Sequence, residues 1–330
     1  MITATHQTSL IGNSAPMRRL RALIAKVAPT RLPVLIEGAT GTGKELIAAL
    51  LHHESARTGS FVAFNVCSIG DSMFEDALFG HARGAYTGAI HESLGFLREA
   101  NGGTAFFDEI SGLSLPLQAK LLRAVETGVF RPIGAGRDVH SDFRVIAATN
   151  ERLSDLTDCG RFRADLRHRL SAVVITVPTL AERVDDIPDL ARHFVRLAAG
   201  NDLPIEPSAL ELLMDTSWAG NVRELKHVID VATAFARGVL DTRALDAALA
   251  QRTTGIRHIG VIHDPGERRE LVAALQGAAW DVDRAAVDLG IHRATMYRRM
   301  KRHGVEAPRV APSRATMRQH VATRAISLMS

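Results

Sequence analysis

The chain has 330 residues, 46% of them hydrophobic and 23% charged, which is the composition of an ordinary globular protein of about two domains. No apolar run approaches the roughly 18 residues of a membrane span, and no signal-peptide pattern is visible, so the sequence predicts a cytoplasmic protein without a membrane anchor. The net charge of +4 is uneven, because residues 267–330 hold 12 Lys and Arg against 6 Asp and Glu. This excess indicates a nucleic-acid-binding segment at the C-terminal end.

Short apolar runs alternate with helical patterns over the first half of the chain. Five of these runs are typical of buried parallel strands. They span 33–37, 61–65, 104–108, 144–150 and 173–177. Helical patterns lie between them, notably at 19–27, 44–53 and 115–126. The alternation predicts an α/β fold with a parallel sheet covered by helices on both faces.

The strands stop after Pro178, and four helical patterns follow. They span 186–199, 207–215, 221–236 and 242–249. Turn-rich residues then indicate a linker, followed by a compact helical unit and a basic tail that is flexible in part. The predicted division is an α/β subdomain at 1–177, a helical subdomain at 178–250, the linker at 251–266, the helical unit at 267–304 and the tail at 305–330.

A glycine-rich segment joins the first predicted strand to the following helix and fits the phosphate-binding pattern G-x-x-x-x-G-K. Its glycines let backbone amides turn inward around phosphate oxygens, and the helix N-terminus adds positive potential. The lysine is expected to reach the β- and γ-phosphates of ATP. A chance glycine-rich turn is the alternative, but the strand before it and the helix after it favour the phosphate site. The segment is Gly38-Ala39-Thr40-Gly41-Thr42-Gly43-Lys44.

Two carboxylates, Asp108 and Glu109, end the third predicted strand. Phosphoryl transfer needs charge neutralisation and a positioned water, and such a pair supplies both. Glu45 stands where Ser or Thr usually ligates the metal, so Asp108 is expected to hold Mg²⁺ and Glu109 to polarise the attacking water. Asn150 ends the fourth strand, where its side chain can sense the γ-phosphate. The alternatives are a solvated strand end for the carboxylates and a plain cap for Asn150.

A hexapeptide of small residues, with an aromatic residue followed by a hydroxyl residue, lies between the phosphate-binding loop and Asp108. It has little to bury, and its two glycines favour a mobile loop with one projecting tip. Its sequence is Gly84-Ala85-Tyr86-Thr87-Gly88-Ala89.

The C-terminal unit has the order of a helix-turn-helix. Leu271, Ala274 and Leu275 form one helical stripe, Asp281 can cap a second helix, and Gly290 makes the turn before a basic third helix. This order predicts binding to double-stranded DNA, and a basic helix that only faces solvent is the alternative. Arg293 and Thr295 are expected to contact base edges. Four later cations are expected to contact phosphates, namely Arg298, Arg299, Lys301 and Arg302.

Taken in order, these motifs resemble the activators of sigma-54 RNA polymerase, a family of AAA+ P-loop ATPases. The matching segments are 78–89, 95–104, 121–123, 181–187 and 218–225, within a resemblance that runs from about residue 10 to residue 249. In this family the hexapeptide is the loop that grips the sigma factor, more commonly with Phe at the place of Tyr86. Glu is common at the place of Glu45.

The resemblance implies further roles. Asn65 resembles the residue that restrains the catalytic glutamate, and Arg223 the sensor arginine of a helical lid. Arg163 and Arg169 resemble the arginines that enter a neighbouring subunit's site in a ring and stabilise transition-state charge. A turn-forming Asn65 and arginines that face solvent are the alternatives.

The C-terminal unit resembles the Fis-type domain that is common in these activators, with two departures. Trp280-Asp281 stands where Gly-Asn is usual, and His292 stands where Ser often caps the recognition helix. The departures leave the fold in place and put the details of base recognition in question.

The sequence therefore predicts an ATP-driven activator that binds enhancer DNA, forms a ring, expected to be a hexamer, and remodels closed complexes of the sigma-54 RNA polymerase holoenzyme. No sensory pattern precedes the ATPase, so we expect control by a regulatory protein in trans or by abundance. One rival is a regulator of this family that acts with another polymerase form, against which the intact hexapeptide argues. The second rival is an AAA+ motor of DNA replication, a class that lacks such a hexapeptide.

Overall fold

The computed structural model describes residues 10–255, 265–278, 280–282, 284–285, 289 and 305. The chain forms two compact units that divide after Gly255. Among the described residues, no helix is long and apolar enough to span a bilayer.

The first unit is built on a five-stranded parallel sheet with the strand order β2-β3-β6-β1-β7. All five predicted strands are present, and their ends shift only slightly. The parallel arrangement is also confirmed. The strands are β1 (Val34–Glu37), β2 (Phe61–Asn65), β3 (Thr104–Asp108), β6 (Arg144–Thr149) and β7 (Val173–Thr176).

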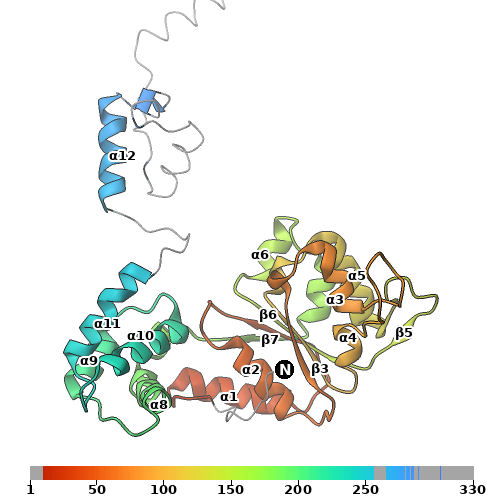
Figure 1. The fold of residues 1–330 in the computed structure, drawn as a ribbon, viewed down its shortest axis with the longest axis horizontal. Coiled ribbons are helices and arrows are strands. Elements are labelled where there is room, and N and C mark those ends of the chain that lie inside the picture. Colours follow the sequence, from red (N-terminus) through yellow and green to blue (C-terminus); the bar gives the residue numbers. More distant parts are fainter. Residues whose placement is uncertain are drawn as a thin grey trace, which may run out of the picture. The chain divides into compact units, whose positions relative to one another are not determined.

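Helices cover both faces of this sheet, as predicted. Successive strand residues point to opposite faces, so Ile36 is buried against α1 and α2 while Leu35 is buried against α3, α5 and α7. Figure 1 shows α1 and α2 on one side of the strands and α3, α5 and α6 on the other. The helices are α1 (Ala15–Val27), α2 (Lys44–His53), α3 (Asp71–Phe79), α4 (Phe96–Glu99), α5 (Leu115–Thr127), α6 (Leu153–Asp158) and α7 (Ala164–Leu170).

Helix α1 begins at Ala15, earlier than the predicted residue 19. Pro16 lies in its first turn, where a missing N–H costs no hydrogen bond and the fixed φ suits a helix. The proline therefore starts the helix, although the apolar pattern becomes regular only later.

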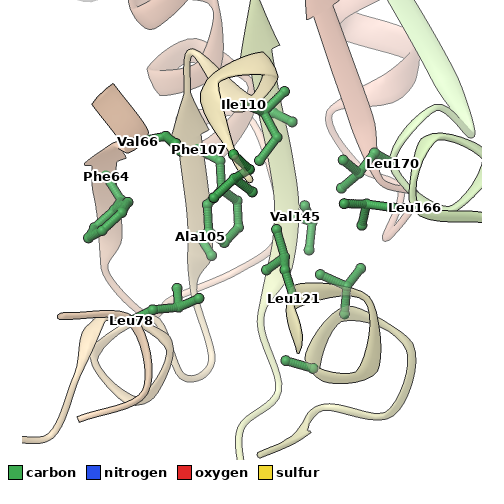
Figure 2. Close-up of a cluster of buried hydrophobic side chains, with 14 of the residues drawn as sticks. Phe64, Val66, Leu78, Ala105, Phe107, Ile110, Leu121, Val145, Leu166 and Leu170 are labelled. Atoms are coloured by element: carbon green, nitrogen blue, oxygen red, sulfur yellow. The ribbon is translucent and has the colours of Figure 1, made fainter. Parts of the chain in front are cut away.

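The larger core fixes the strand that carries the predicted carboxylates. Phe107 of β3 and Val145 of β6 share a buried cluster with Leu78 of α3, Leu121 of α5 and Leu166 of α7 (Figure 2). Each fully buried side chain of this size stabilises the fold by about 1.5–3 kcal/mol. The end of β3 is therefore a rigid platform for Asp108 and Glu109.

A buried arginine joins the sheet to the end of α1. Arg144 of β6 is 2% exposed and donates to Ala28 O at 2.7 Å, to Val27 O at 3.0 Å and to Leu32 O at 3.3 Å. Two of these acceptors lie at the C-terminal end of α1, where helix carbonyls lack partners within the helix. Burial, together with the nearby charge of Arg57, lowers the pKa of Arg144.

One pair of strands was not predicted, because each contains only two residues. β4 (Val129–Phe130) and β5 (Val139–His140) pair antiparallel as a hairpin after α5. His81, just after α3, makes single β-bridges to Ser93 and to Ile133 of the hairpin turn. The segment between α3 and α4 therefore starts beside this hairpin, and its end pairs with its own start.

Four helices around their own core form the helical subdomain, and all four were predicted. They follow a 3₁₀ segment, η3 (Leu180–Asp186), whose Asp186 accepts from the backbone N and the Oγ of Ser14 at 2.8 and 2.6 Å. Helix α11 continues past its predicted end to Gly255. The helices are α8 (Ile187–Ala199), α9 (Pro207–Asp215), α10 (Asn221–Phe235) and α11 (Thr242–Gly255).

The second unit contains α12 (Pro265–Gly277) and a small core. Leu271 and Leu275 are buried and Ala274 packs beside them, which confirms the predicted stripe. Asp281 Oδ1 accepts from the backbone N of Arg284 at 3.2 Å, as expected of a helix cap. The six residues predicted to contact DNA lie outside the described residues.

Trp280 has a φ of +65°, a left-handed conformation that is costly for most side chains and free for glycine. This geometry gives a physical reason for the glycine that is usual at this place in Fis-type domains. The half-buried indole packs against the small core and offsets part of that cost.

Candidate nucleotide site and surface loop

The predicted phosphate-binding loop connects β1 to α2 and has the geometry of an anion site. Gly41 and Gly43 have φ of +79° and +101°, which turns the loop backbone before α2 begins at Lys44. The N-terminal N–H groups of α2 have no partners within the helix and favour a bound anion. Lys44 is 7% exposed, and its Nζ donates to Gly38 O at 2.9 Å.

The two predicted carboxylates lie next to Lys44. Its Nζ is 3.9 Å from Glu109 Oε1, and Asp108 Oδ1 accepts from Glu109 N at 3.1 Å. Glu109 has a φ of +54°, a left-handed conformation that turns the chain sharply after β3. Burial lowers the pKa of Lys44, and Arg223 adds to this effect, whereas the charges of Glu109 and Asp108 oppose it.

Asn65 lies directly beside Asp108 in the sheet register. Its Nδ2 donates to Asp108 Oδ2 at 3.4 Å, and its Oδ1 accepts from Cys67 N at 2.9 Å. The amide thus contacts the neighbouring carboxylate rather than Glu109, because the register opposes Asn65 to Asp108. Its restraint of Glu109 stays a prediction.

The residues fit a magnesium ion held in part by phosphates. Each oxygen of Asp108 accepts one N–H group, so lone pairs on both remain for a hard cation. Glu45 is exposed at the start of α2. Asn150 is exposed where β6 ends, at the same edge of the sheet as the phosphate-binding loop.

The helical subdomain contacts the phosphate-binding loop through the first turn of α10. Arg223 N donates to Gly41 O at 3.2 Å. Asn221, at the start of α10, donates from Nδ2 to Thr40 O at 3.0 Å and accepts from Leu180 N at 2.8 Å. The structure therefore brings Arg223 to the loop, close enough to influence Lys44.

A cavity of about 200 Å³ opens beside the loop, and sequence reasoning did not find it. Apolar side chains dominate its walls, and a few polar groups join them, which is the usual make-up of a small-molecule site. Its residues come from segments far apart in sequence, so no local pattern reveals them. They are Leu10, Ile11, Met17, Thr42, Gly43, Leu46, Arg183, Leu190, His193, Phe194 and Val222.

Arg163 and Arg169 lie at the two ends of α7 and are exposed. Arg163 pairs with Asp165 at 2.8 Å, and Arg169 Nη2 donates to Val125 O and Glu126 O, both at 3.3 Å. The structure thus places both arginines on contacts away from Lys44.

The hexapeptide forms a closed turn between α3 and α4. Gly84 N donates to Ala89 O at 2.8 Å, and Ala89 N to Tyr86 O at 3.0 Å. Thr87 is exposed at the tip, as predicted for a projecting loop. Tyr86 instead lies back on the protein, with its ring 5.1 Å from the His81 ring and its hydroxyl 3.2 Å from Asp76 Oδ2.

Comparison with known families assigns the chain in three parts. Residues 10–176 match the sigma-54 interaction domain, residues 181–258 the AAA+ ATPase lid domain, and residues 266–303 the bacterial regulatory protein Fis family. The first match alone covers half of the chain.

Curated relatives extend over nearly the whole chain. The transcriptional regulatory protein ZraR of Salmonella typhimurium is 38% identical over 304 residues, or 90% of this chain and 69% of the relative. The Nif-specific regulatory protein of Klebsiella pneumoniae is 37% identical over 314 residues, or 92% of this chain and 60% of the relative. The chain thus spans about two thirds of the length of these relatives.

Solved structures agree with these relatives. NtrX from Brucella abortus in complex with ATP has a TM-score of 0.67 at 32% identity, covering 90% of this chain and 69% of that chain. The same protein in complex with ADP has a TM-score of 0.68, covering 91% and 70%. RuvB of Thermotoga maritima, at 18% identity and a TM-score of 0.53, shares the fold alone.

Proposed function

Because the chain belongs to the sigma-54-dependent transcriptional activators and has their ATPase, lid and Fis-type modules in order, we propose that it opens promoters by ATP-driven remodelling. In this proposal the Gly84–Ala89 loop contacts sigma-54 and moves as ATP is bound and hydrolysed. The C-terminal unit holds the protein at enhancer DNA.

The single observation that carries this proposal is the position of the hexapeptide in the chain. It lies in the segment that leaves the nucleotide site at Asn65 and returns to it at Asp108, two residues that are paired in the sheet and joined by a hydrogen bond. A change in the contacts of either residue therefore acts on both ends of the segment that carries the loop. The chain itself therefore connects the nucleotide site to both ends of the loop segment, so a displacement at the site can move the loop.

ATP is the nucleotide that the site supports. The cavity beside the loop would take the base, and the N–H groups of the loop and of α2 would take the phosphates. Lys44 would leave the Gly38 carbonyl and bind the β- and γ-phosphates, while Arg223 would report the phosphate to the lid. A magnesium ion on Asp108 would neutralise phosphate charge.

Hydrolysis itself needs a positioned water and stabilised charge. Glu109 is the residue that would orient and polarise the water, and Asn150 would contact the γ-phosphate. Arg163 and Arg169, which are both exposed, would complete the site of a neighbouring subunit in a ring, which we propose to be a hexamer. Their ion pair and carbonyl contacts would be exchanged for the neighbour's phosphates.

The remaining partners follow from the family. Arg293, Thr295 and the four later cations would contact enhancer DNA, and a protein acting in trans would control the ATPase. Both require a cytoplasmic location, where polymerase and DNA are found.

Promoter opening tests the proposal. Purified protein, ATP and sigma-54 holoenzyme are mixed with a sigma-54 promoter that carries the protein's DNA site, and open complexes are counted by permanganate footprinting. We expect opening with wild-type protein and none with Thr87→Ala, which should still hydrolyse ATP. If wild-type protein hydrolyses ATP without opening the promoter, the proposal is refuted. The two alternatives that then remain are a regulator that acts with another polymerase form and an AAA+ motor of DNA replication.

A further inference from the structure

Tyr86 of the hexapeptide loop is held against a small polar site that we name the dock, formed by Asp76 and His81. The Tyr86 hydroxyl donates to Asp76 Oδ2 at 3.2 Å, and the Tyr86 ring meets the His81 ring edge to face, with centroids 5.1 Å apart. Partial burial and this hydrogen bond raise the pKa of Tyr86. A phenylalanine could make the ring contact but not the hydrogen bond.

The dock is rigid because several elements hold His81. Its Nδ1 contacts Asp76 Oδ1, and its Nε2 lies 3.0 Å from His91 O. Its backbone exchanges hydrogen bonds with Ser93 at 3.1 and 3.0 Å, and it also bridges Ile133 of the β4–β5 hairpin turn. Helix α3, the strand-like segment after the loop and the hairpin therefore all fix one imidazole.

The loop is held far less firmly than its dock. Gly84 and Gly88 have positive φ, and an added Cβ at either would meet no atom within 4 Å, so open space surrounds the loop backbone there. Thr87 is exposed, and Tyr86 retains 47% of its exposure. Ala85 lies against Gly134 of the hairpin turn and Ala89 is buried, so the base of the turn is packed. The hydrogen bond and ring contact of Tyr86 are the polar side-chain attachment of its exposed part.

We propose that Asp76 and His81 are positioning residues that hold Tyr86 in a docked conformation, which must open before the tip can reach sigma-54. This inference rests on the proposed function of the loop. A hydroxyl and a ring edge that contact the dock are not free to contact a second protein, so docking and sigma-54 binding compete. The dock therefore lowers the fraction of molecules in which Tyr86 is free. The strength of the hydrogen bond from the Tyr86 hydroxyl determines how far that fraction falls.

Hydrogen–deuterium exchange of the loop in the full-length protein measures docking without any partner. We expect Asp76→Ala to speed amide exchange in residues 84–90 by about three- to tenfold, the size of effect for a half-exposed hydrogen bond to a carboxylate. Asp76→Asn keeps an acceptor for the hydroxyl and should change exchange less. Glu75→Ala removes the adjacent carboxylate, which pairs with Lys120 instead, and should leave the loop unchanged.

A double-mutant cycle separates docking from general loosening of α3. Tyr86→Phe alone should raise exchange, and Asp76→Ala should add little in that background, because the hydrogen bond is already gone. Equal effects of Asp76→Ala in both backgrounds would overturn the dock, as would unchanged exchange in both single variants. Tyr86→Phe is isosteric, so it tests the idea even if Asp76→Ala folds poorly.

Binding of purified sigma-54 in the absence of nucleotide gives the second readout. Asp76→Ala should bind about three- to tenfold more tightly than wild type, with an unchanged ATPase rate. Faster exchange without tighter binding would overturn the claim that the dock controls access to sigma-54. Promoter opening by wild-type protein, measured separately, shows in that case whether the proposed function survives.

Discussion

The nucleotide site and the hexapeptide loop belong to one continuous chain segment, yet they are held in place by different means. Around Lys44, backbone carbonyls, buried strands and the start of a helix fix each functional group. Around Tyr86, one hydrogen bond and one ring contact do so, both partly exposed.

This difference matches what each region is expected to do. Catalytic groups need a fixed geometry, because small displacements of reacting atoms cost large factors in rate. A loop that engages a partner in one stage of a cycle needs contacts that break at little cost.

The largest effect is expected at Glu109, the proposed catalytic carboxylate. Glu109→Gln removes the base that would polarise water and should lower the rate of ATP hydrolysis by about 10²–10⁴-fold. ATP binding should persist, because Lys44 and the loop backbone are unchanged. Phosphate release and binding of a fluorescent ATP analogue measure the two quantities.

A glutamate outside the site provides the control for this substitution. Glu182 accepts from Thr179 in a capping box, which glutamine also supports, so Glu182→Gln should leave hydrolysis within about twofold. An equal loss in both variants would show that the effect of Glu109→Gln arises from the fold rather than from catalysis.

The next largest effect is expected in the rigid sheet that supports the nucleotide site. Arg144→Met removes a donor from the carbonyls of Val27, Ala28 and Leu32, of which Val27 O keeps the two hydrogen bonds from Thr30. We expect the free energy of unfolding to fall by about 3 kcal/mol. Arg31→Met removes an exposed arginine at 4.0 Å from Asp142 and should change it by about 0.5 kcal/mol or less. Urea denaturation distinguishes the two, and similar values would contradict a structural role of Arg144.

Two glycines at the loop have nearly equal φ but different surroundings. Gly80 has φ +76° and Gly84 φ +78°, but a Cβ at Gly80 would overlap Ser93 O, whereas one at Gly84 would meet nothing within 4 Å. Gly84→Ala should therefore cost about 1–2 kcal/mol of conformational strain alone. Gly80→Ala should cost more, by about 1–3 kcal/mol, as measured by thermal unfolding.

If the two alanine variants were equally stable, the base of the loop would be as free as its tip. That result would break the contrast between a fixed dock and a loosely held turn.

The smallest effect is a dependence of stability on pH. Burial lowers the pKa of Lys44 from its usual 10.5, so its charged form costs stability when the protein is folded. This cost is fully present below the lowered pKa and disappears as the pH rises from that value to about 10.5. Compared with Lys44→Met, wild-type protein should gain stability as the pH is raised from 7 to 10, and parallel pH profiles would contradict this.

Local patterns predicted the fold and the grouping of the nucleotide-site residues. The five strands, the lid helices and the convergence of Lys44, Asp108 and Glu109 were all expected. Buried strands and short motifs produce patterns among residues that are close in sequence, so they can be recognised locally. The strand order was not predicted, since it depends on which strands pair across the sheet. The start of α1 was displaced, because Pro16 begins the helix before its apolar pattern.

Features made by distant residues escaped prediction. The cavity beside the loop joins Ile11, Thr42, Phe194 and Val222, which no spacing relates. The dock joins Tyr86 to Asp76 through a hydrogen bond that only the three-dimensional turn creates. Arg144 resembled an ordinary strand residue, and its role depends on carbonyls more than a hundred residues away.

Asn221 imposes an unusual demand on the evolution of the chain. It starts α10 with φ +52°, accepts from Leu180 N and donates to Thr40 O, while it is 3% exposed. Glycine tolerates the backbone but supplies no side-chain partner, aspartate lacks the donor, and a longer amide does not fit a short buried bridge. Every single substitution at this position therefore loses either the backbone conformation or a side-chain hydrogen bond. A saturation library at residue 221, selected for folded protein, should return asparagine.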